Sequence, residues 1–213
     1  MARGWFITLE GIEGSGKTTQ ATILANSLRM HGHRVVLTRE PGGTRTGELI
    51  RAIFLDSTLS LTTNAELLLV LADRAQHVQE KLRPALDSGE VVISDRYSDS
   101  TVAYQGYGRG LDLKLVDELN RLSSSGVTPD LTLLLDCPAE MGLARTRLRA
   151  ESAARTRDRF EEEDLEFHRR VRNGFLTIAE SEPSRVVLLD ASRNQDEVST
   201  DVLQLVLERV KRR

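Results

Sequence analysis

The chain has 213 residues, with 29 lysines and arginines against 32 aspartates and glutamates, which gives a formal net charge of −3 at pH 7. This length fits one substantial α/β domain, and the composition excludes a collagen-like repeat and a disulfide scaffold. The slightly acidic balance argues against a general binder of nucleic acids or membrane surfaces, which carries a basic excess. An anionic partner must therefore be held by local groups.

The cysteine, the histidines and the hydropathy of the chain bear on disulfides, metal sites and membrane spans. Cys137 is the only cysteine and lies in the apolar stretch LTLLLDC, so we expect a buried thiol. The histidines His31, His33, His77 and His168 show no metal-ligand spacing and are expected at the surface or in packing. No signal-peptide core stands at the N-terminus, and no apolar stretch approaches the roughly 18 residues of a membrane span. We expect a soluble cytoplasmic protein with no membrane or nucleic-acid partner.

Five short apolar runs alternate with longer amphipathic segments. The runs are WFITLE (5–10), RVVLT (34–38), VVISD (91–95), LTLLLD (131–136) and RVVLLD (185–190). Continuous apolar runs indicate strands buried on both faces, and their alternation with helices indicates a parallel, doubly wound sheet. No linker or repeat marks a second domain. The sequence therefore predicts one α/β domain over residues 1–213.

Two apolar stripes, one near each end of the chain, predict helices. The stripe after the first run consists of Ala21, Leu24, Ala25 and Leu28. The stripe near the C-terminal end consists of Val198, Val202, Leu205, Val206 and Val210. Both are expected to pack on the sheet.

The segment GIEGSGKTTQ (11–20) matches the pattern G-x-x-x-x-G-K-[ST]. In this pattern, backbone N–H groups at a helix N-terminus cradle phosphate oxygens, the lysine neutralises charge and the threonine hydroxyl can hold Mg²⁺. A plain strand-to-helix turn is the alternative, and the flanking strand and helix favour phosphate binding. The predicted triphosphate site consists of Gly11, Ile12, Glu13, Gly14, Ser15, Gly16, Lys17 and Thr18.

Charged residues near this loop point to a second substrate. Glu13 suffers Coulomb repulsion inside an anion-binding loop unless it faces a hydroxyl, a metal-bound water or a cation. The stretch SDRYSDSTVAYQGYGRG (94–110) places Asp95 and Arg96 at the end of the third predicted strand, where open α/β sheets bind ligands. Asp95 suits Mg²⁺ and Arg96 suits a phosphate, whereas an ordinary surface pair is the alternative.

The segment TNAELLLVLADRAQHV (63–78) combines a helix start with an unusual arginine. Thr63 and Glu66 have the spacing of a capping box. Arg74 occupies a position where the helical stripe calls for an apolar residue. Its guanidinium either snorkels to the surface or faces a ligand pocket lined by Val70 and Leu71.

Residues 143–167 are rich in arginine and contain no lysine. The arginines are Arg145, Arg147, Arg149, Arg155, Arg157 and Arg159. One interpretation is a solvated helix face paired with the acidic residues 161–164. The other is a mobile lid at about 143–160 that brings one or two arginines over a transferring phosphoryl group.

Six motifs stand in order along nearly the whole chain: FITLEGIEGSGKTTQ, LTREPGGT, ADRAQHV, ISDRYSDSTVAYQG, TPDLTLLLD and DRFEEE. As an ordered set, they resemble those of the bacterial thymidylate kinases. The resemblance implies a P-loop NTPase fold of the nucleoside monophosphate kinase type, with a five-stranded parallel sheet, and a homodimer. It also implies transfer of the ATP γ-phosphate to dTMP with Mg²⁺, giving dTDP for dTTP synthesis.

The resemblance also implies roles for single residues. Lys17, Thr18 and Asp95 would serve the ATP phosphates and Mg²⁺, and Glu13 would approach the deoxyribose 3′-hydroxyl. The thymidylate side would consist of Glu13, Arg51, Val70, Arg74, Arg96, Ser100 and Gln105. In this family the catalytic arginine comes from the phosphate loop or from the lid. Because Gly14 and Ser15 offer no loop arginine, the lid should supply it from Arg149, Arg155, Arg157 and Arg159.

Two departures from the family pattern keep alternatives open. Val70 stands where the family often has a phenylalanine that stacks on thymine, a contact worth roughly 1–3 kcal/mol per base in single-strand binders. Leu71 or a residue from another segment would then have to cover the base. The lid is also longer than in short-lid members, which leaves its critical arginine open.

Two other functions compete with this interpretation. A kinase for another nucleoside monophosphate or for a deoxynucleoside is compatible with Val70. A non-enzymatic nucleotide switch is disfavoured, since the chain has no N-K-x-D motif and a switch gives no reason for an arginine-rich lid.

Overall fold

The computed structural model describes residues 3–152 and 158–210, and these contain one parallel five-stranded sheet. Its strands are β1 (Phe6–Glu10), β2 (Val35–Arg39), β3 (Val91–Asp95), β4 (Leu131–Asp136) and β5 (Val186–Asp190). The predicted strands are confirmed, with ends that differ by at most one residue. Their spatial order is β2-β3-β1-β4-β5, so the chain changes direction across the sheet at β1. Open α/β sheets bind ligands at such a switch point.

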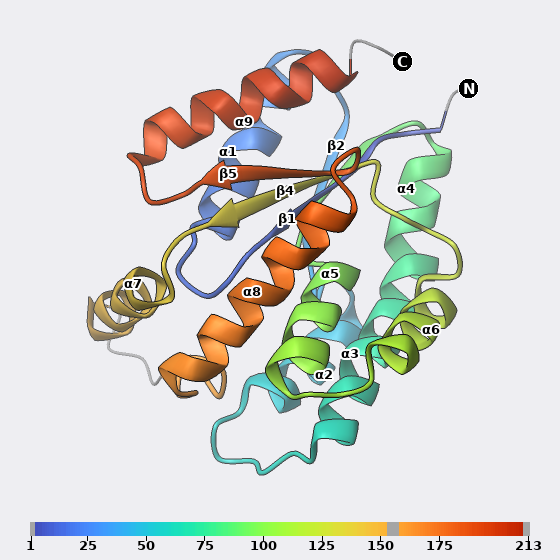
Figure 1. Cartoon of the computed structure of the whole chain (residues 1–213). Coiled ribbons are helices and arrows are strands. Elements are labelled where there is room, and N and C mark those ends of the chain that lie inside the picture. The colour runs from blue at the N-terminus through green and yellow to red at the C-terminus, as the bar shows by residue number, and fades with distance from the viewer. Residues whose placement is uncertain (1–2, 153–157, 211–213) are drawn as a thin grey trace.

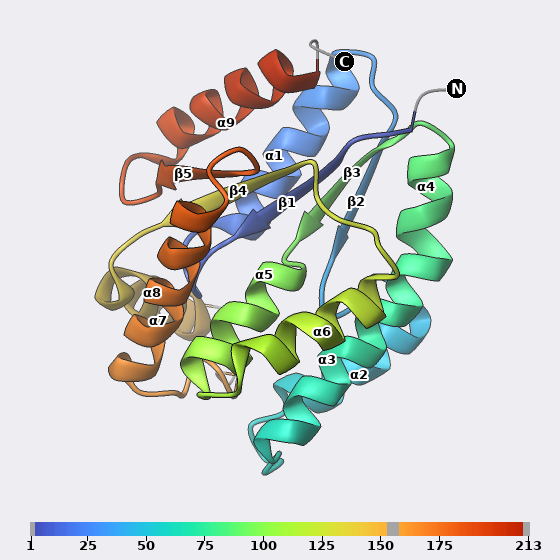
Figure 2. The same cartoon turned by 45° about the vertical axis from the view of Figure 1, so that its right-hand side comes forward.

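Helices cover both faces of this sheet (Figures 1 and 2). They are α1 (Lys17–Met30), α2 (Arg45–Leu55), α3 (Thr63–His77), α4 (Arg83–Asp87), α5 (Ser98–Thr101), α6 (Leu113–Ser124), α7 (Ala139–Ser152), α8 (Leu165–Ser181) and α9 (Gln195–Val210). Two wider, π-type segments, η1 (Val78–Leu82) and η2 (Val102–Gly108), continue α3 and α5. Helices α1 and α9 lie on one face, whereas α2 to α6 and α8 lie on the other.

The two predicted apolar stripes form the core on the α1 and α9 side of the sheet. Ala21, Leu24, Ala25 and Leu28 are at most 1 % exposed. Val198, Val202 and Val206 are also buried, and Leu205 and Val210 pack against the same cluster. Cys137 is buried as well, as predicted. The stripes therefore place α1, and with it the glycine loop that precedes it, firmly on the sheet.

Helix α3 begins differently from the sequence expectation. Its N-cap is Thr62, whose hydroxyl accepts a hydrogen bond from the Ala65 N–H at 3.3 Å, so the capping box predicted from Thr63 is wrong. The shift of one position removes Glu66 from the cap. Glu66 is instead 1 % exposed, and its carboxylate points into the protein.

Among the residues described by the structure, no helix combines the length and the hydropathy that a membrane crossing needs.

Candidate active site

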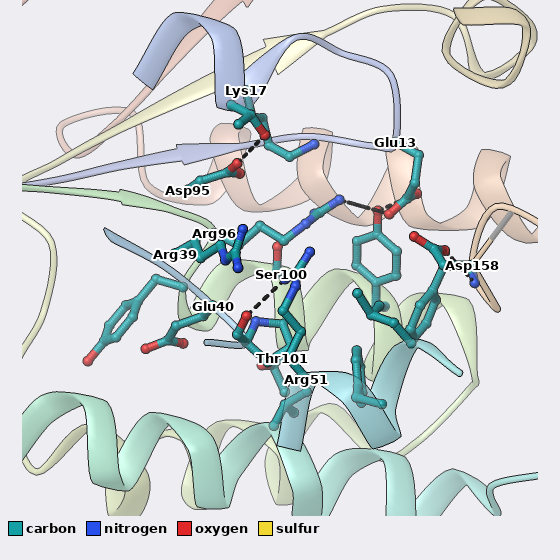
Figure 3. Close-up of a pocket in the computed structure, with 18 of the residues that line it drawn as sticks. Glu13, Lys17, Arg39, Glu40, Arg51, Asp95, Arg96, Ser100, Thr101 and Asp158 are labelled. Carbon is teal, nitrogen blue, oxygen red and sulfur yellow. Dashed lines mark hydrogen bonds and ion pairs between the residues drawn. The ribbon is translucent and has the colours of Figure 1, made fainter. Parts of the chain in front are cut away.

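A single cavity gathers most of the predicted site residues at the carboxyl ends of β1 and β3 (Figure 3). The predicted residues on its wall are Glu13, Gly14, Gly16, Lys17, Thr18, Arg51, Val70, Arg74, Asp95, Arg96, Ser100, Gln105 and Arg149. Gly11, Ile12 and Ser15 do not line the cavity, but Ile12 and Ser15 accept hydrogen bonds from Lys17, and the Gly11 carbonyl accepts one from Arg96. This is the edge at which an open parallel sheet binds its ligands.

The glycine loop holds Lys17 in a buried position at the start of α1. The Lys17 ammonium donates hydrogen bonds to the Ile12 carbonyl at 2.7 Å and to Ser15 Oγ at 3.3 Å. Burial and the neighbouring Arg96 lower the pKa of Lys17 to about 8, although Asp95 opposes the shift. The loop thus concentrates N–H donors and a cation at a helix N-terminus, which is an anion site.

The glycine loop also lies in direct contact with α7. Gly14 has a φ of +71°, and a Cβ at this position would lie 2.1 Å from the Gly142 carbonyl oxygen. Glycine is required here both by the positive backbone angle and by the close approach of the loop backbone to the backbone of α7.

Thr18 and Asp95 bring a hydroxyl and a carboxylate together beside the loop. Thr18 Oγ1 donates to Asp95 Oδ2 at 2.5 Å, joining the first turn of α1 to the end of β3. Oxygen donors of this kind suit Mg²⁺, which usually takes one or two protein ligands and completes its shell with phosphate and water. The donor set therefore fits the ion that the sequence implies.

Glu13 is surrounded by hydrogen-bond donors, which offset the Coulomb repulsion expected for a carboxylate in an anion-binding loop. The Arg96 guanidinium donates to Glu13 at 2.8 Å, and the Tyr104 hydroxyl does so at 2.6 Å. The buried His168 places Nδ1 3.4 Å from the same carboxylate. Burial alone would raise the pKa of Glu13, but Arg96, His168 and Lys17 outweigh it and hold that pKa well below its usual range. Glu13 is thus a buried anion beside the cavity.

Arg96 lies at the centre of the cavity wall. Its backbone has a φ of +75°, which is uncommon for a residue with a side chain. The guanidinium also donates to the Gly11 carbonyl at 2.9 Å and to Ser100 Oγ at 3.0 Å, and lies 4.9 Å from the centroid of the Tyr104 ring. The strained backbone aims this cation into the cavity, as strain at functional sites commonly does.

Arg74 is buried, so the surface alternative for its side chain is wrong. Its exposed fraction is 2 %, and it donates to Glu40 at 2.8 Å, Asn120 at 2.6 Å and Thr101 at 2.9 Å. It lines the cavity together with Val70, as the second interpretation predicted, whereas Leu71 lies in the core and not on the cavity wall. These three polar partners explain why an arginine interrupts the apolar stripe.

Arg51 and Gln105, which were predicted on the thymidylate side, are held by different hydrogen bonds. Arg51 donates to the Pro41 carbonyl at 2.8 Å, and burial together with nearby Arg39 lowers its pKa. Gln105 is buried and donates from its amide to Glu66 at 2.7 Å. These bonds fix both side chains at the cavity wall before any ligand enters.

The predicted lid arginines separate into three groups. Arg149 lies on the cavity wall and pairs with Glu161 at 2.9 Å. Arg159 donates to Glu66 at 2.7 Å and to the Phe54 carbonyl, so its guanidinium is bound to the body of the protein. Arg155 and Arg157 lie outside the described residues.

Other residues on the cavity wall were missed by sequence reasoning. They are Thr19, Arg39, Glu40, Pro41, Phe54, Leu55, Tyr97, Thr101, Tyr104, Asp158, Phe160 and Glu161. Several stand inside the quoted motifs LTREPGGT, ISDRYSDSTVAYQG and DRFEEE, so membership in a motif was the signal that could have found them. Phe54 belongs to no quoted motif and gave no such signal.

The chain is similar to known proteins in both sequence and structure. The family model described as thymidylate kinase matches residues 9–202. A thymidylate kinase from Geobacter sulfurreducens is 52 % identical over 212 residues, covering 99 % of this chain and 100 % of the relative. One from Nitratidesulfovibrio vulgaris is 53 % identical over 204 residues, covering 94 % and 95 %. The crystal structure of thymidylate kinase from Ehrlichia chaffeensis matches with a TM-score of 0.77 and 37 % identity, covering 96 % of this chain and 99 % of that one.

Proposed function

Since the chain belongs to the thymidylate kinase family, we propose that this cavity transfers the γ-phosphate of ATP to dTMP, giving dTDP for dTTP synthesis. The observation that carries the proposal is the meeting of two anion-binding groups on one wall. The Lys17 ammonium lies in the glycine loop, and the Arg96 guanidinium follows the neighbouring strand. A phosphoryl donor and a phosphorylated acceptor can therefore face each other.

The glycine loop from Gly11 to Thr18 would bind the donor. Its N–H groups would cradle the ATP phosphates and the Lys17 ammonium would neutralise charge on the phosphoryl group in transfer. Thr18 and Asp95 would hold Mg²⁺, which would neutralise charge on the phosphate oxygens of ATP. The negative charges of the phosphates would in turn favour the protonated form of the buried Lys17 ammonium.

The opposite wall would bind dTMP. Arg96 and Arg51 would contact its 5′-phosphate, and Arg74, Ser100 and Gln105 would contact the nucleotide further in. Glu13 would approach the deoxyribose 3′-hydroxyl, for which its carboxylate is an acceptor. No general base is needed, because the attacking phosphate oxygen is already anionic near neutral pH.

The lid at about 143–160 of this single 1–213 domain would complete the site. Arg149 is the described lid arginine on the cavity wall, and its exposed side chain would have to leave only Glu161 to follow a transferring phosphoryl group. Arg155 and Arg157 are further candidates. Arg159 is the weakest one, because its guanidinium already binds Glu66 and the Phe54 carbonyl. A phosphate would have to break both contacts.

We also propose a cytoplasmic homodimer that binds neither nucleic acid nor membrane. Large apolar side chains are exposed on neighbouring helices, with Leu49 and Ile53 on α2 and Leu68 on α3, 45–65 % exposed. Helices α2 and α3 lie side by side (Figure 2). Contiguous exposed apolar surface is typical of a protein interface, which supports pairing through these helices.

The proposal is tested by replacing one cation on each side of the cavity. Lys17→Ala should lower kcat for ATP and dTMP by at least about 10²–10³-fold, the usual cost of removing one group that stabilises transition-state charge. Arg96→Ala should chiefly raise the KM for dTMP. Turnover is measured by coupled assay with dTMP, dUMP, dCMP, AMP and thymidine as acceptors.

The exposed Lys114 on α6 provides the matched control, since Lys114→Ala removes the same charge far from the cavity. Circular dichroism of all variants checks that the fold survives. A wild-type protein that turned over no dTMP, or a Lys17→Ala variant with unchanged kcat, would refute the proposed reaction. An unchanged KM for dTMP in Arg96→Ala would remove Arg96 from the acceptor site.

A further inference from the structure

Two phenylalanine rings supply the aromatic surface that α3 lacks at Val70. Phe54 at the end of α2 and Phe160 in the turn formed by residues 158–163 both line the cavity, and so does Val70. The rings are 5 % and 4 % exposed, with centroids 5.0 Å apart and planes inclined by 33°. An aromatic wall is therefore present, but it comes from segments outside α3.

The other aromatic rings on the wall are committed to polar partners. The Tyr97 hydroxyl donates to the Val127 carbonyl at 2.9 Å, and the Arg74 guanidinium lies 5.0 Å from its ring centroid. Tyr104 donates its hydroxyl to Glu13. Phe54 and Phe160 have no polar group to satisfy, so their rings are the apolar part of the wall that a nucleotide base can contact.

Phe160 is the better placed of the two, because several groups fix its ring. The guanidinium of Arg159 lies 4.8 Å from the ring centroid and that of Arg109 lies 5.7 Å away. Both guanidinium groups are anchored on Glu66. The Phe160 N–H donates to Asp158 at 3.0 Å, which fixes the turn itself. The ring is thus held at the cavity rather than merely packed near it.

Phe54 is less suited to meet a base directly. Its carbonyl is bound by Arg159, and the same guanidinium lies 5.4 Å from its ring centroid. The ring also packs against Phe160, and both rings belong to one buried cluster beside the cavity. Phe54 therefore supports Phe160 from α2.

We propose that Phe160 is a substrate-binding residue whose ring stacks on the thymine base, in place of the aromatic side chain that α3 lacks. Base recognition then depends on the turn at the C-terminal end of the lid, which also contributes Glu161 to the cavity wall. This inference rests on the proposed function, because it assumes that dTMP occupies the cavity.

The test replaces the ring and compares a ligand that has a base with one that has none. Phe160→Leu should raise the KM for dTMP by about 5–150-fold, the factor that corresponds to the roughly 1–3 kcal/mol of one base–aromatic contact. The KM for ATP should stay within about twofold. Inhibition by 2-deoxyribose 5-phosphate, which keeps the sugar and phosphate but lacks the base, should be unchanged.

Two further variants separate stacking from packing. Phe175→Leu is the matched control, because this ring also contacts Tyr104, at 6.1 Å between centroids, but lies off the cavity wall. Its KM for dTMP should stay close to that of the wild type. Val70→Phe, combined with Phe160→Leu, restores a ring on α3 and should recover most of the lost dTMP affinity.

The results distinguish this inference from the proposed function. If Phe160→Leu leaves the KM for dTMP unchanged, or weakens dTMP and 2-deoxyribose 5-phosphate equally, the ring only fills the core and the inference is overturned. Failure of rescue by Val70→Phe overturns it as well. Absence of dTMP turnover in the wild type would instead refute the reaction itself.

Discussion

At the scale of single residues, the cavity is built from buried charges that each need a specific partner. Glu13 is the clearest case, since its carboxylate is only 12 % exposed, and Arg96 and neighbouring donors face it and hold its pKa low. A dTMP phosphate that binds Arg96 would compete for the same cation. The pair thus links the donor loop to the acceptor side through one ion pair.

Asp73 is a second buried carboxylate, and its pairing is incomplete. Its Oδ1 accepts from the Gly42 N–H at 2.9 Å, but Oδ2 has no hydrogen-bond partner among the described residues. Burial and the nearby Glu40 raise the pKa of Asp73 to about 7. Between about pH 4 and 7 the folded protein therefore keeps a proton that the unfolded chain releases, and the contribution of Asp73 to stability falls as pH rises.

Asp73→Asn should consequently stabilise the protein at pH 8 by about 1–3 kcal/mol, because the amide removes a negative charge that burial and Glu40 disfavour. The asparagine keeps the acceptor for Gly42 and carries no charge. At pH 5 the gain should shrink, because wild-type Asp73 is then protonated. Urea unfolding at both pH values measures the difference, with the exposed Asp87→Asn as control. A gain that is equal at both pH values, or a loss at pH 8, would contradict the titration of Asp73.

Sequence reasoning predicted the residues whose roles are set by local spacing. Lys17 and Thr18 belong to one short pattern, and Asp95 and Arg96 directly follow a predicted strand, so sheet topology alone brings them together. The pairing of Arg159 with Glu66 joins residues 93 positions apart, and no local pattern indicates it. Only the folded chain reveals that this arginine is already bound.

At the scale of elements, the 158–163 turn is attached to α3 through a buried carboxylate. Glu66 accepts from Arg159 at 2.7 Å and from Arg109 at 3.1 Å, and Arg109 also pairs with Glu163 at 2.6 Å. Gln105 donates to the same carboxylate. The turn, α3 and η2 therefore meet at one acceptor.

Glu66→Gln should loosen this attachment, because the amide keeps the shape of the side chain but leaves the largely covered Arg159 guanidinium without its anion and Arg109 with Glu163 alone. Hydrogen exchange measured by mass spectrometry should speed up over residues 158–163, and the KM for dTMP should rise. Glu163→Gln is the control, since it removes only the outer carboxylate and leaves Glu66 in place. Unchanged exchange over the turn in Glu66→Gln would show that the attachment does not depend on this charge.

The strands and packed helices were predictable because each buries a continuous or periodic apolar face. The start of α3 was misplaced by one residue, because Thr62 and Thr63 can both cap a helix and spacing alone favoured Thr63. The 158–163 turn has neither strand nor helix periodicity. Its position depends on Glu66 and Phe54, which belong to distant parts of the chain.

At the scale of the whole molecule, the proposed dimer makes a direct prediction. Leu68→Glu places a charge in the exposed apolar surface of α2 and α3, so the protein should become monomeric at micromolar concentration. Burying an unpaired charge in an interface costs several kcal/mol. Sedimentation velocity of wild type and variant measures the change in mass.

Met30→Glu is the control for this experiment, because Met30 is 80 % exposed at the end of α1, on the other face of the sheet. It should sediment like the wild type. A wild-type protein that is monomeric, or a Leu68→Glu variant that remains dimeric, would place the interface elsewhere or exclude it.

The contact between the glycine loop and α7 limits how this catalytic site can change. Any side chain at Gly14 would strike the Gly142 carbonyl oxygen, and the backbone angle there is unfavourable for it. An arginine introduced at position 14 would therefore push α7 aside, and α7 is the helix that carries Arg149. In the proposed mechanism, a loop arginine and the lid Arg149 would thus exclude each other in this backbone, and a change from one to the other would require the loop and the helix to be altered together.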